Sequence, residues 1–154
     1  MKRRNFLKGT LATSMVGVAV SAGMLSPRAV LAAWPESAFA AKKSSDAMST
    51  LLGSSNASPS SDIKIKAPDI AENGAVVPIT ISTNMANVET VTLLVSENPQ
   101  PLCCNFELAK NAEPFVSTRI KMGKTSDVVA VVKSGGKLFS ANKTVKVTIG
   151  GCGG

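Results

Sequence analysis

Residues 77–82 read VPITIS, in which apolar and polar side chains alternate with a period of two. Successive side chains of a β-strand point to opposite faces, so this stretch predicts a strand that turns Val77, Ile79 and Ile81 towards a core. Pro78 has no amide hydrogen to donate to a neighbouring strand. We therefore expect this strand to lie at a sheet edge or to contain a local bulge.

The same alternation continues on both sides of this stretch. We expect the following apolar residues to point inward from their strands: Ile63, Ile65, Val91, Leu93, Val95, Leu102, Cys104, Phe106, Leu108, Val116, Ile120, Met122, Val145, Val147 and Ile149. Residues 128–132 are apolar on both faces, and residues 134–137 (SGGK) predict a turn into a strand at 138–141. About seven short strands with regular turn signals predict an all-β protein, an immunoglobulin-like β-sandwich over residues 62–149.

Residues 34–53 predict a short helical segment in front of the sandwich. Pro35 suits the first position of a helix, and Gly53 suits its C-terminal stop. The apolar residues between them have spacings that form one face: Ala40, Ala47, Met48, Leu51 and Leu52. Residues 54–61 predict a loop, because serine, asparagine and proline dominate them.

Residues 1–33 have the pattern of an export signal. Residues 2–8 read KRRNFLK, a twin-arginine pattern, and a moderately apolar stretch follows at 9–25. Small residues at 29–33 predict cleavage after Ala32 or Ala33. The alternative is a membrane anchor, but the apolar stretch is short for a span and diluted by small polar residues. The pattern predicts a periplasmic protein exported by the twin-arginine route.

The charge of the chain is concentrated in this first segment. The chain has 17 basic and 10 acidic residues, and five basic but no acidic residues precede Ala33. Removal of the signal leaves 12 basic and 10 acidic residues, a net charge of about +2. The basic balance is therefore an export feature, and the chain shows no pattern typical of nucleic-acid binding.

The chain ends in residues 150–154, GGCGG, which we call the glycine arm. Gly150, Gly151, Gly153 and Gly154 have no side chains that could hold Cys152 in a groove of its own protein. The pattern predicts a thiol on a thin, extended arm that enters a narrow site on another protein. The alternative is an incidental cysteine at a frayed end, which does not explain glycine on both flanks.

These features together resemble the SoxY family. The resemblance rests on the twin-arginine signal, the Trp34-Pro35 start, NPQPL at residues 98–102 before Phe106, and KVTIGGCGG at 146–154. It implies a non-enzymatic carrier that pairs with SoxZ and binds thiosulfate-derived sulfur covalently on Cys152. It also implies transient contacts with the haem enzyme SoxXA, the hydrolase SoxB and, where present, SoxCD. The resemblance implies no cofactor or metal beyond the sulfur cargo.

The chain has no histidine, so no imidazole is available to activate Cys152. An unperturbed thiol is only about 3% thiolate at pH 7, and we expect the partner enzyme to supply the activation. Direct enzyme activity is disfavoured, since no paired acid–base motif or phosphate-binding glycine loop is present.

Two other functions remain open. One is a ubiquitin-like carrier that holds sulfur on the terminal Gly154 carboxyl, which the export signal disfavours. The other is a periplasmic assembly or binding module, tethered to a partner by a disulfide through Cys152.

Cys103 and Cys104 are not explained by the carrier chemistry. Adjacent strand residues point to opposite faces, so we expect Cys104 in the core with Leu102 and Phe106, and Cys103 near the surface or an interface. The pair lacks the spacing of a zinc site, and a bond between neighbours would be strained. A reversible bond between Cys103 and Cys152 is a further hypothesis.

Overall fold

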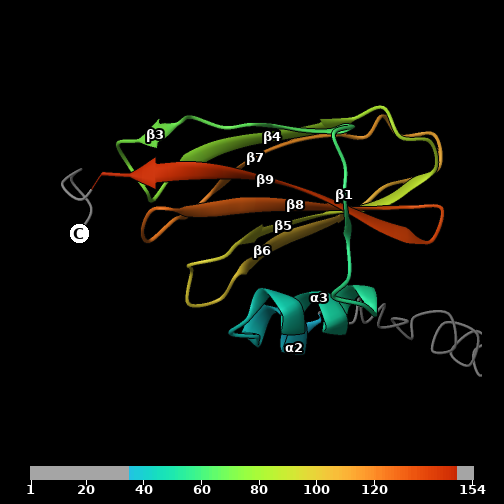
Figure 1. The fold of residues 1–154 in the computed structure, drawn as a ribbon, viewed down its shortest axis with the longest axis horizontal. Helices are drawn as coiled ribbons and strands as arrows, with labels where there is room; N and C mark the ends of the chain where they lie inside the picture. The colour runs from blue at the N-terminus through green and yellow to red at the C-terminus, as the bar shows by residue number, and fades with distance from the viewer. Residues whose placement is uncertain (1–34, 149–154) are drawn as a thin grey trace, which may run out of the picture. The chain divides into compact units, whose positions relative to one another are not determined.

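The computed structural model describes residues 35–148, shown in Figure 1. They form two short helices and nine strands: α2 (Glu36–Ala40), α3 (Ser44–Leu52), β1 (Ser58–Pro59), β2 (Ile63–Lys66), β3 (Ile70–Ala71), β4 (Val77–Thr83), β5 (Val88–Val95), β6 (Leu102–Glu107), β7 (Phe115–Ile120), β8 (Ser126–Ser134) and β9 (Lys137–Val147). The proposed signal segment, Trp34, Ile149 and the glycine arm lie outside the described residues.

The strands form two sheets with a shared core, which confirms the all-β sandwich. The larger sheet has the order β1-β9-β8-β5-β6, with β3 also paired to β9, and the smaller sheet has the order β2-β4-β7. Side chains from both sheets meet in one buried cluster that includes Ile79, Ile81, Leu93, Val116 and Val132. This layered packing is typical of sandwiches of the immunoglobulin-like class.

The alternation in β4 is confirmed by burial. Val77, Ile79 and Ile81 are at most 1% exposed, while Pro78 is exposed. The larger sheet differs, because β5 is buried on both faces from Val91 to Val95. Its second face is covered by the helices.

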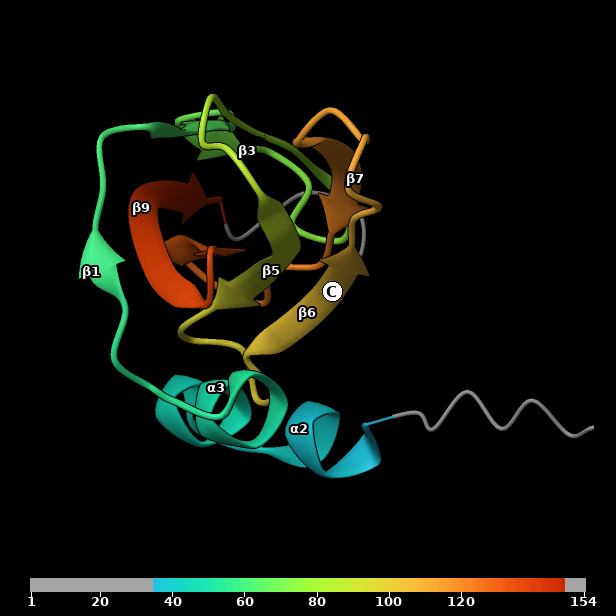
Figure 2. The same cartoon turned by 90° about the vertical axis from the view of Figure 1, so that its right-hand side faces the viewer.

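Helices α2 and α3 pack against the outer face of the larger sheet, as both views show (Figures 1 and 2). Ala47 and Met48 of α3 belong to a second buried cluster together with Leu94 of β5 and Val131 of β8. The helical region is broken at residues 41–43 into two helices. Gly53 ends α3 in a left-handed conformation with φ +79°, and its N–H donates to the Ser49 carbonyl at 3.1 Å. This confirms the predicted helix stop.

The expectation that β4 lies at a sheet edge or contains a bulge is wrong, because β4 is the central strand of its sheet and pairs with β2 and β7 without a register shift. The physical reason lies in the length of β2. Strand β2 pairs only with residues Thr80–Thr83 of β4, whereas Pro78 is paired on the β7 side with Arg119. At Pro78, β4 therefore has a strand on one side only, and the proline is tolerated there.

The two strands expected at 138–141 and 145–149 are one continuous strand. β9 runs from Lys137 to Val147 and pairs with β8 from Ser126↔Val145 to Ser134↔Lys137. The turn between β8 and β9 is as predicted, with φ +55° at Gly135 and +75° at Gly136. Positive φ at both positions favours glycine and fits the twist of a tight hairpin. The sheet also begins earlier than residue 62, because β1 at Ser58–Pro59 interrupts the expected loop.

Candidate functional site

The chain leaves the sandwich through the end of β9, which strand β3 holds from one side. Ile70 and Ala71 of β3 pair in parallel with Lys146 and Val147. The Lys146 N–H donates to the Asp69 carbonyl at 3.0 Å, and the Thr148 N–H donates to the Ala71 carbonyl at 3.1 Å. These bonds fix the backbone up to the last described residue.

The loop between β7 and β8 holds the end of β9 from the other side. The Val147 N–H donates to the hydroxyl oxygen of Thr125 at 3.0 Å. Two residues earlier, the Val145 side chain is fully buried in the sandwich core. The backbone at 145–148 is therefore held by hydrogen bonds on both edges and by apolar packing.

A lysine ties the segment before β3 to the same strand. The Lys143 ammonium lies 3.0 Å from an Asp69 carboxylate oxygen and donates to the Ala67 carbonyl at 2.7 Å. Asp69 is largely exposed, so this ion pair contributes little by itself. Together with the backbone bonds, it places residues 67–71 along β9.

Gly74 packs closely against the same region. Its carbonyl accepts a hydrogen bond from the Met122 N–H at 2.7 Å. A Cβ at position 74 would collide with the Met122 carbonyl oxygen and would lie 2.9 Å from a methyl carbon of Val147. The backbone approaches this closely only because residue 74 has no side chain.

The hydrogen bonds that hold residues 146–148, which we call the β9 anchor, could not be predicted from the sequence. A two-residue strand such as β3 has no visible periodicity, and Thr125 lies in an exposed loop without any turn signature. The predicted site residues themselves, Cys152 with Gly150, Gly151, Gly153 and Gly154, lie outside the described residues. The hypothesis of a bond between Cys103 and Cys152 falls outside them for the same reason.

A β-bulge changes the expected orientation of the cysteine pair. In the register of β5 and β6, Leu93 pairs with Cys104 and Leu94 pairs with Leu102, so Cys103 has no partner. Leu102 therefore packs with the helix-facing cluster, while Cys103 and Cys104 both pack against the core between the sheets. The expectations that the two cysteines face opposite ways, and that Cys104 shares a face with Leu102, are wrong. An extra residue in one strand shifts the alternation by one position.

Both cysteines are half-buried and carry free thiols. Burial raises the pKa of Cys103 to about 11, against a smaller lowering by a hydrogen bond from the Val95 backbone. Burial also raises the pKa of Cys104 to about 12, with a further contribution from the neighbouring Cys103. A thiolate is therefore disfavoured at both positions near neutral pH.

The two cysteines line a cleft of about 370 Å³ between β6 and β7, the edge strands of the two sheets. Arg119 and Lys121 line the same cleft from the side of β7, and both are exposed. Asn98 fixes the adjoining loops, since its amide donates to the Lys121 carbonyl at 2.7 Å and accepts from the Gly123 N–H at 3.1 Å.

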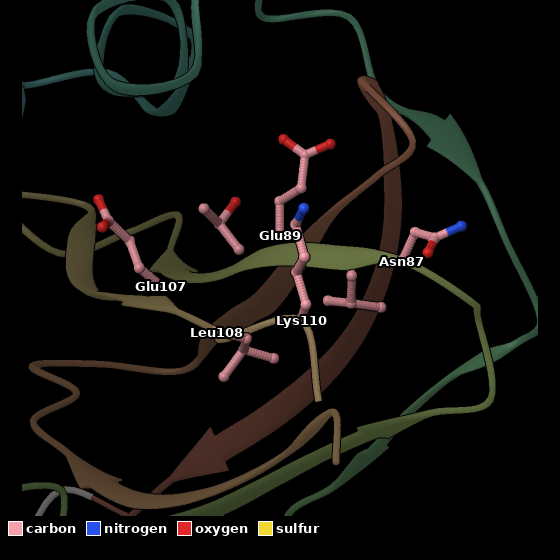
Figure 3. A pocket seen from close by; sticks show the side chains of 7 residues that line it. Asn87, Glu89, Glu107, Leu108 and Lys110 are labelled. Carbon is pink, nitrogen blue, oxygen red and sulfur yellow. The ribbon is translucent and has the colours of Figure 1, made fainter. Parts of the chain in front are cut away.

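A larger cleft of about 640 Å³ lies where β5 begins and β6 ends (Figure 3). Glu89 in this cleft pairs with Lys133 at 3.1 Å and accepts a hydrogen bond from the Gly136 N–H at 2.9 Å. The Gly136 bond and then Lys133 lower the pKa of Glu89. The carboxylate is thus engaged in holding the β8–β9 turn, and no thiol lines this cleft among the described residues.

Within residues 35–148, no group of three or more histidine, cysteine, aspartate or glutamate side chains is placed to hold a metal ion. Neither described helix combines the length and the apolar character that a membrane span requires.

Comparison with known proteins places the chain among sulfur carriers. The family model for the sulfur oxidation protein SoxY matches residues 48–152. The solved structure of the sulfur carrier protein SoxY from Chlorobium limicola f thiosulfatophilum is 41% identical, with a TM-score of 0.62; the alignment covers 68% of this chain and 94% of that chain.

More distant structures share the fold alone. The superoxide reductase (neelaredoxin) of Ignicoccus hospitalis is 20% identical with a TM-score of 0.50, over 56% of this chain and 80% of that chain. A variant of the same reductase gives the same identity and TM-score. No curated protein matches the sequence.

Proposed function

The chain belongs to the SoxY family of sulfur carrier proteins, and we propose that it carries thiosulfate-derived sulfur as a covalent adduct of Cys152. The observation that carries this proposal is the extent of the family match, which runs from residue 48 to residue 152 and so includes the cysteine of the glycine arm. The anchor at Val147 and Thr148 supports it, because a carrier needs a fixed base for an arm that visits other proteins.

The adduct would form and be released in steps that partner enzymes catalyse. In the first step, the Cys152 thiol and thiosulfate form a sulfur–sulfur bond, and one proton and two electrons leave. The electrons pass to a haem enzyme, the role that the family resemblance gives to SoxXA. In the second step, water displaces sulfate from the adduct, with release of a proton, and leaves a persulfide on Cys152; this is the role of SoxB. Oxidation of the remaining sulfur would fall to SoxCD where present.

This division of labour fits the chemistry of the chain. The chain has no histidine, and an ordinary thiol is only about 3% thiolate at pH 7. The two cysteines of the sandwich have raised pKa values and are poor nucleophiles at neutral pH. We therefore infer that Cys152 is activated within the partner's active site, which the glycine arm is thin enough to enter.

The proposed setting is the periplasm, reached by the twin-arginine route after removal of residues 1–33. The proposed stable partner is SoxZ, in a heterodimer. The Arg3-Arg4 pair and the small residues at 29–33 support the export step. Export in a folded state would allow a partner without its own signal to travel with the chain.

Intact-mass spectrometry of the exported protein tests the proposal. The mass would be measured before and after incubation with thiosulfate and the partner enzymes. We expect one thiosulfonate group per chain, which converts to a single added sulfur atom after the hydrolase acts. The mass of the untreated protein also reports the cleavage site near Ala33.

Cys152→Ser is the matched control, because it removes only the sulfur atom and should abolish both mass additions. A mass addition that persists in Cys152→Ser would contradict the proposal. A permanent disulfide to a partner without any sulfur adduct would instead support the tethered assembly module.

A further inference from the structure

The cleft between β6 and β7 brings together two thiols that an ordinary strand would separate. The bulge opposite Leu93 and Leu94 leaves Cys103 unpaired and turns it to the side on which Cys104 packs. Both residues line the same cleft and carry free thiols. The Cys103 thiol makes a long contact of 3.6 Å to the Pro101 carbonyl, and the Val95 backbone also hydrogen-bonds to its sulfur. Neither contact is a covalent or metal bond, so the sulfur is available to bind a metal ion.

The other groups of the cleft restrict what such a pair can bind. None of the described residues that line it is acidic, and the charged ones are Arg119 and Lys121. Hard cations such as Mg²⁺ and Ca²⁺ require oxygen ligands and would be repelled by this wall. Zinc takes four ligands in structural sites, and the described residues place no third histidine, cysteine or carboxylate beside the pair.

Soft monovalent ions have the opposite requirements. Thiolates are the ligands that select Cu(I), and two thiolates with one Cu(I) form a complex of net charge −1. Arg119 and Lys121 line the same cleft, so the positive charges that balance this complex are close at hand.

From this arrangement, we propose that Cys103 and Cys104 form a two-thiol binding site for a soft monovalent metal ion of the Cu(I) class. In the binding step, two sulfur–hydrogen bonds break, two sulfur–copper bonds form, and two protons are released to solvent. No electron is transferred, since copper enters and remains as Cu(I). The site is separate from the sulfur cargo on Cys152 and does not depend on the proposed carrier function.

Anaerobic titration with Cu(I) tests the site, with a chromophoric Cu(I) chelator as the competitor. The Cys152→Ser protein is used throughout, so that the arm thiol cannot supply a ligand. We expect one Cu(I) per chain and an ultraviolet thiolate-to-copper charge-transfer band. Adding Cys103→Ala or Cys104→Ala should each weaken the affinity for Cu(I) by roughly a hundredfold or more. Loss of a residue that only hydrogen-bonds to a metal ligand typically costs less than this.

Thr118→Ala is the matched control, because Thr118 lines the same cleft from β7 but has no sulfur. It should leave the affinity for Cu(I) unchanged. Equal affinity in the protein with both thiols and in the two cysteine variants would overturn the proposal. Thermal unfolding of the metal-free variants shows whether each is folded.

X-ray absorption at the copper edge tests the site in a protein whose sandwich carries no substitution. The copper-loaded Cys152→Ser protein should show two sulfur neighbours. A coordination shell of only nitrogen and oxygen would exclude the cysteine pair as the site, whatever the stability of the cysteine variants.

Discussion

The backbone N–H of Val147 donates to the Thr125 hydroxyl at 3.0 Å, and this bond joins the end of the last strand to the loop between β7 and β8. On the opposite edge, the Asp69 carbonyl accepts from the Lys146 N–H, and the Ala71 carbonyl of β3 accepts from the Thr148 N–H. The backbone of residues 146–148, the last that the structure describes, is thus hydrogen-bonded on both edges. A carrier benefits from this design, because the reach of its arm is then measured from a fixed base.

Thr125→Val should loosen this base. The substitution keeps the shape of the side chain but removes the oxygen that accepts from Val147, which costs about 0.5–1.5 kcal/mol of unfolding free energy. We expect faster amide hydrogen exchange at Val147 than in the unaltered protein. Thr125→Ser retains the hydroxyl and serves as the control. Equal exchange rates in both variants would show that the bond does not hold the strand.

Gly74→Ala should destabilise the same end of the sandwich. The added methyl group would collide with the Met122 carbonyl oxygen and press on Val147, at a cost of about 1–3 kcal/mol. Chemical denaturation measures this loss. Gly123→Ala is the matched control, because the nearest atom to its Cβ is an Asn98 oxygen at 3.9 Å, and we expect a change within about 0.5 kcal/mol. Equal stability of the two variants would contradict the close contact at Gly74.

The core positions of β4 could be predicted from the sequence because one face of that strand is buried and the other is exposed at Pro78 and half-buried at Thr80 and Ser82. Val77, Ile79 and Ile81 then alternate with polar residues, and the pattern is visible locally. The central place of β4, which contains Pro78, could not be predicted from residues near Pro78. Whether a strand is central depends on its neighbours, and here β2 stops before it reaches the proline.

The orientation of Cys103 and Cys104 could not be predicted, since β6 has apolar surroundings on both faces. Leu102 packs under the helices and Cys104 packs in the sandwich core, so no polar residue marks where the alternation shifts. The bulge becomes visible only in the register with β5. The anchor was missed for a related reason, since β3 pairs with a strand far along the chain and has no pattern of its own.

The proposed role of Cys152, in contrast, rests on a local sequence pattern. A cysteine between paired glycines is recognisable from sequence alone, and the family match includes it. It lies outside the described residues, so its chemistry stays a prediction that the structure supports only through the anchor of β9.

Iodoacetamide at pH 8 should modify one cysteine in the folded protein. The pKa of Cys103 is raised to about 11 and that of Cys104 to about 12, so each is protonated at pH 8, and only about a thousandth or less of either is thiolate. An ordinary thiol with a pKa near 8.5 is about a quarter thiolate at the same pH. Peptide mapping should therefore find the label on Cys152, and on all three cysteines after unfolding. Comparable labelling of Cys103 in the folded protein would show that burial does not protect it.

Bulky residues in the glycine arm should block sulfur loading without disturbing the fold. Gly151→Val and Gly153→Val widen the arm on either side of Cys152, so a site that admits little more than backbone would exclude them. Gly151→Ala adds a single methyl group and should have a smaller effect. The rate of adduct formation by the partner enzymes is followed by intact mass, and unfolding free energies serve as the control because the substitutions lie beyond the end of β9. If the valine variants load at the unaltered rate, the partner's site is not narrow, and the glycines serve another purpose than clearance.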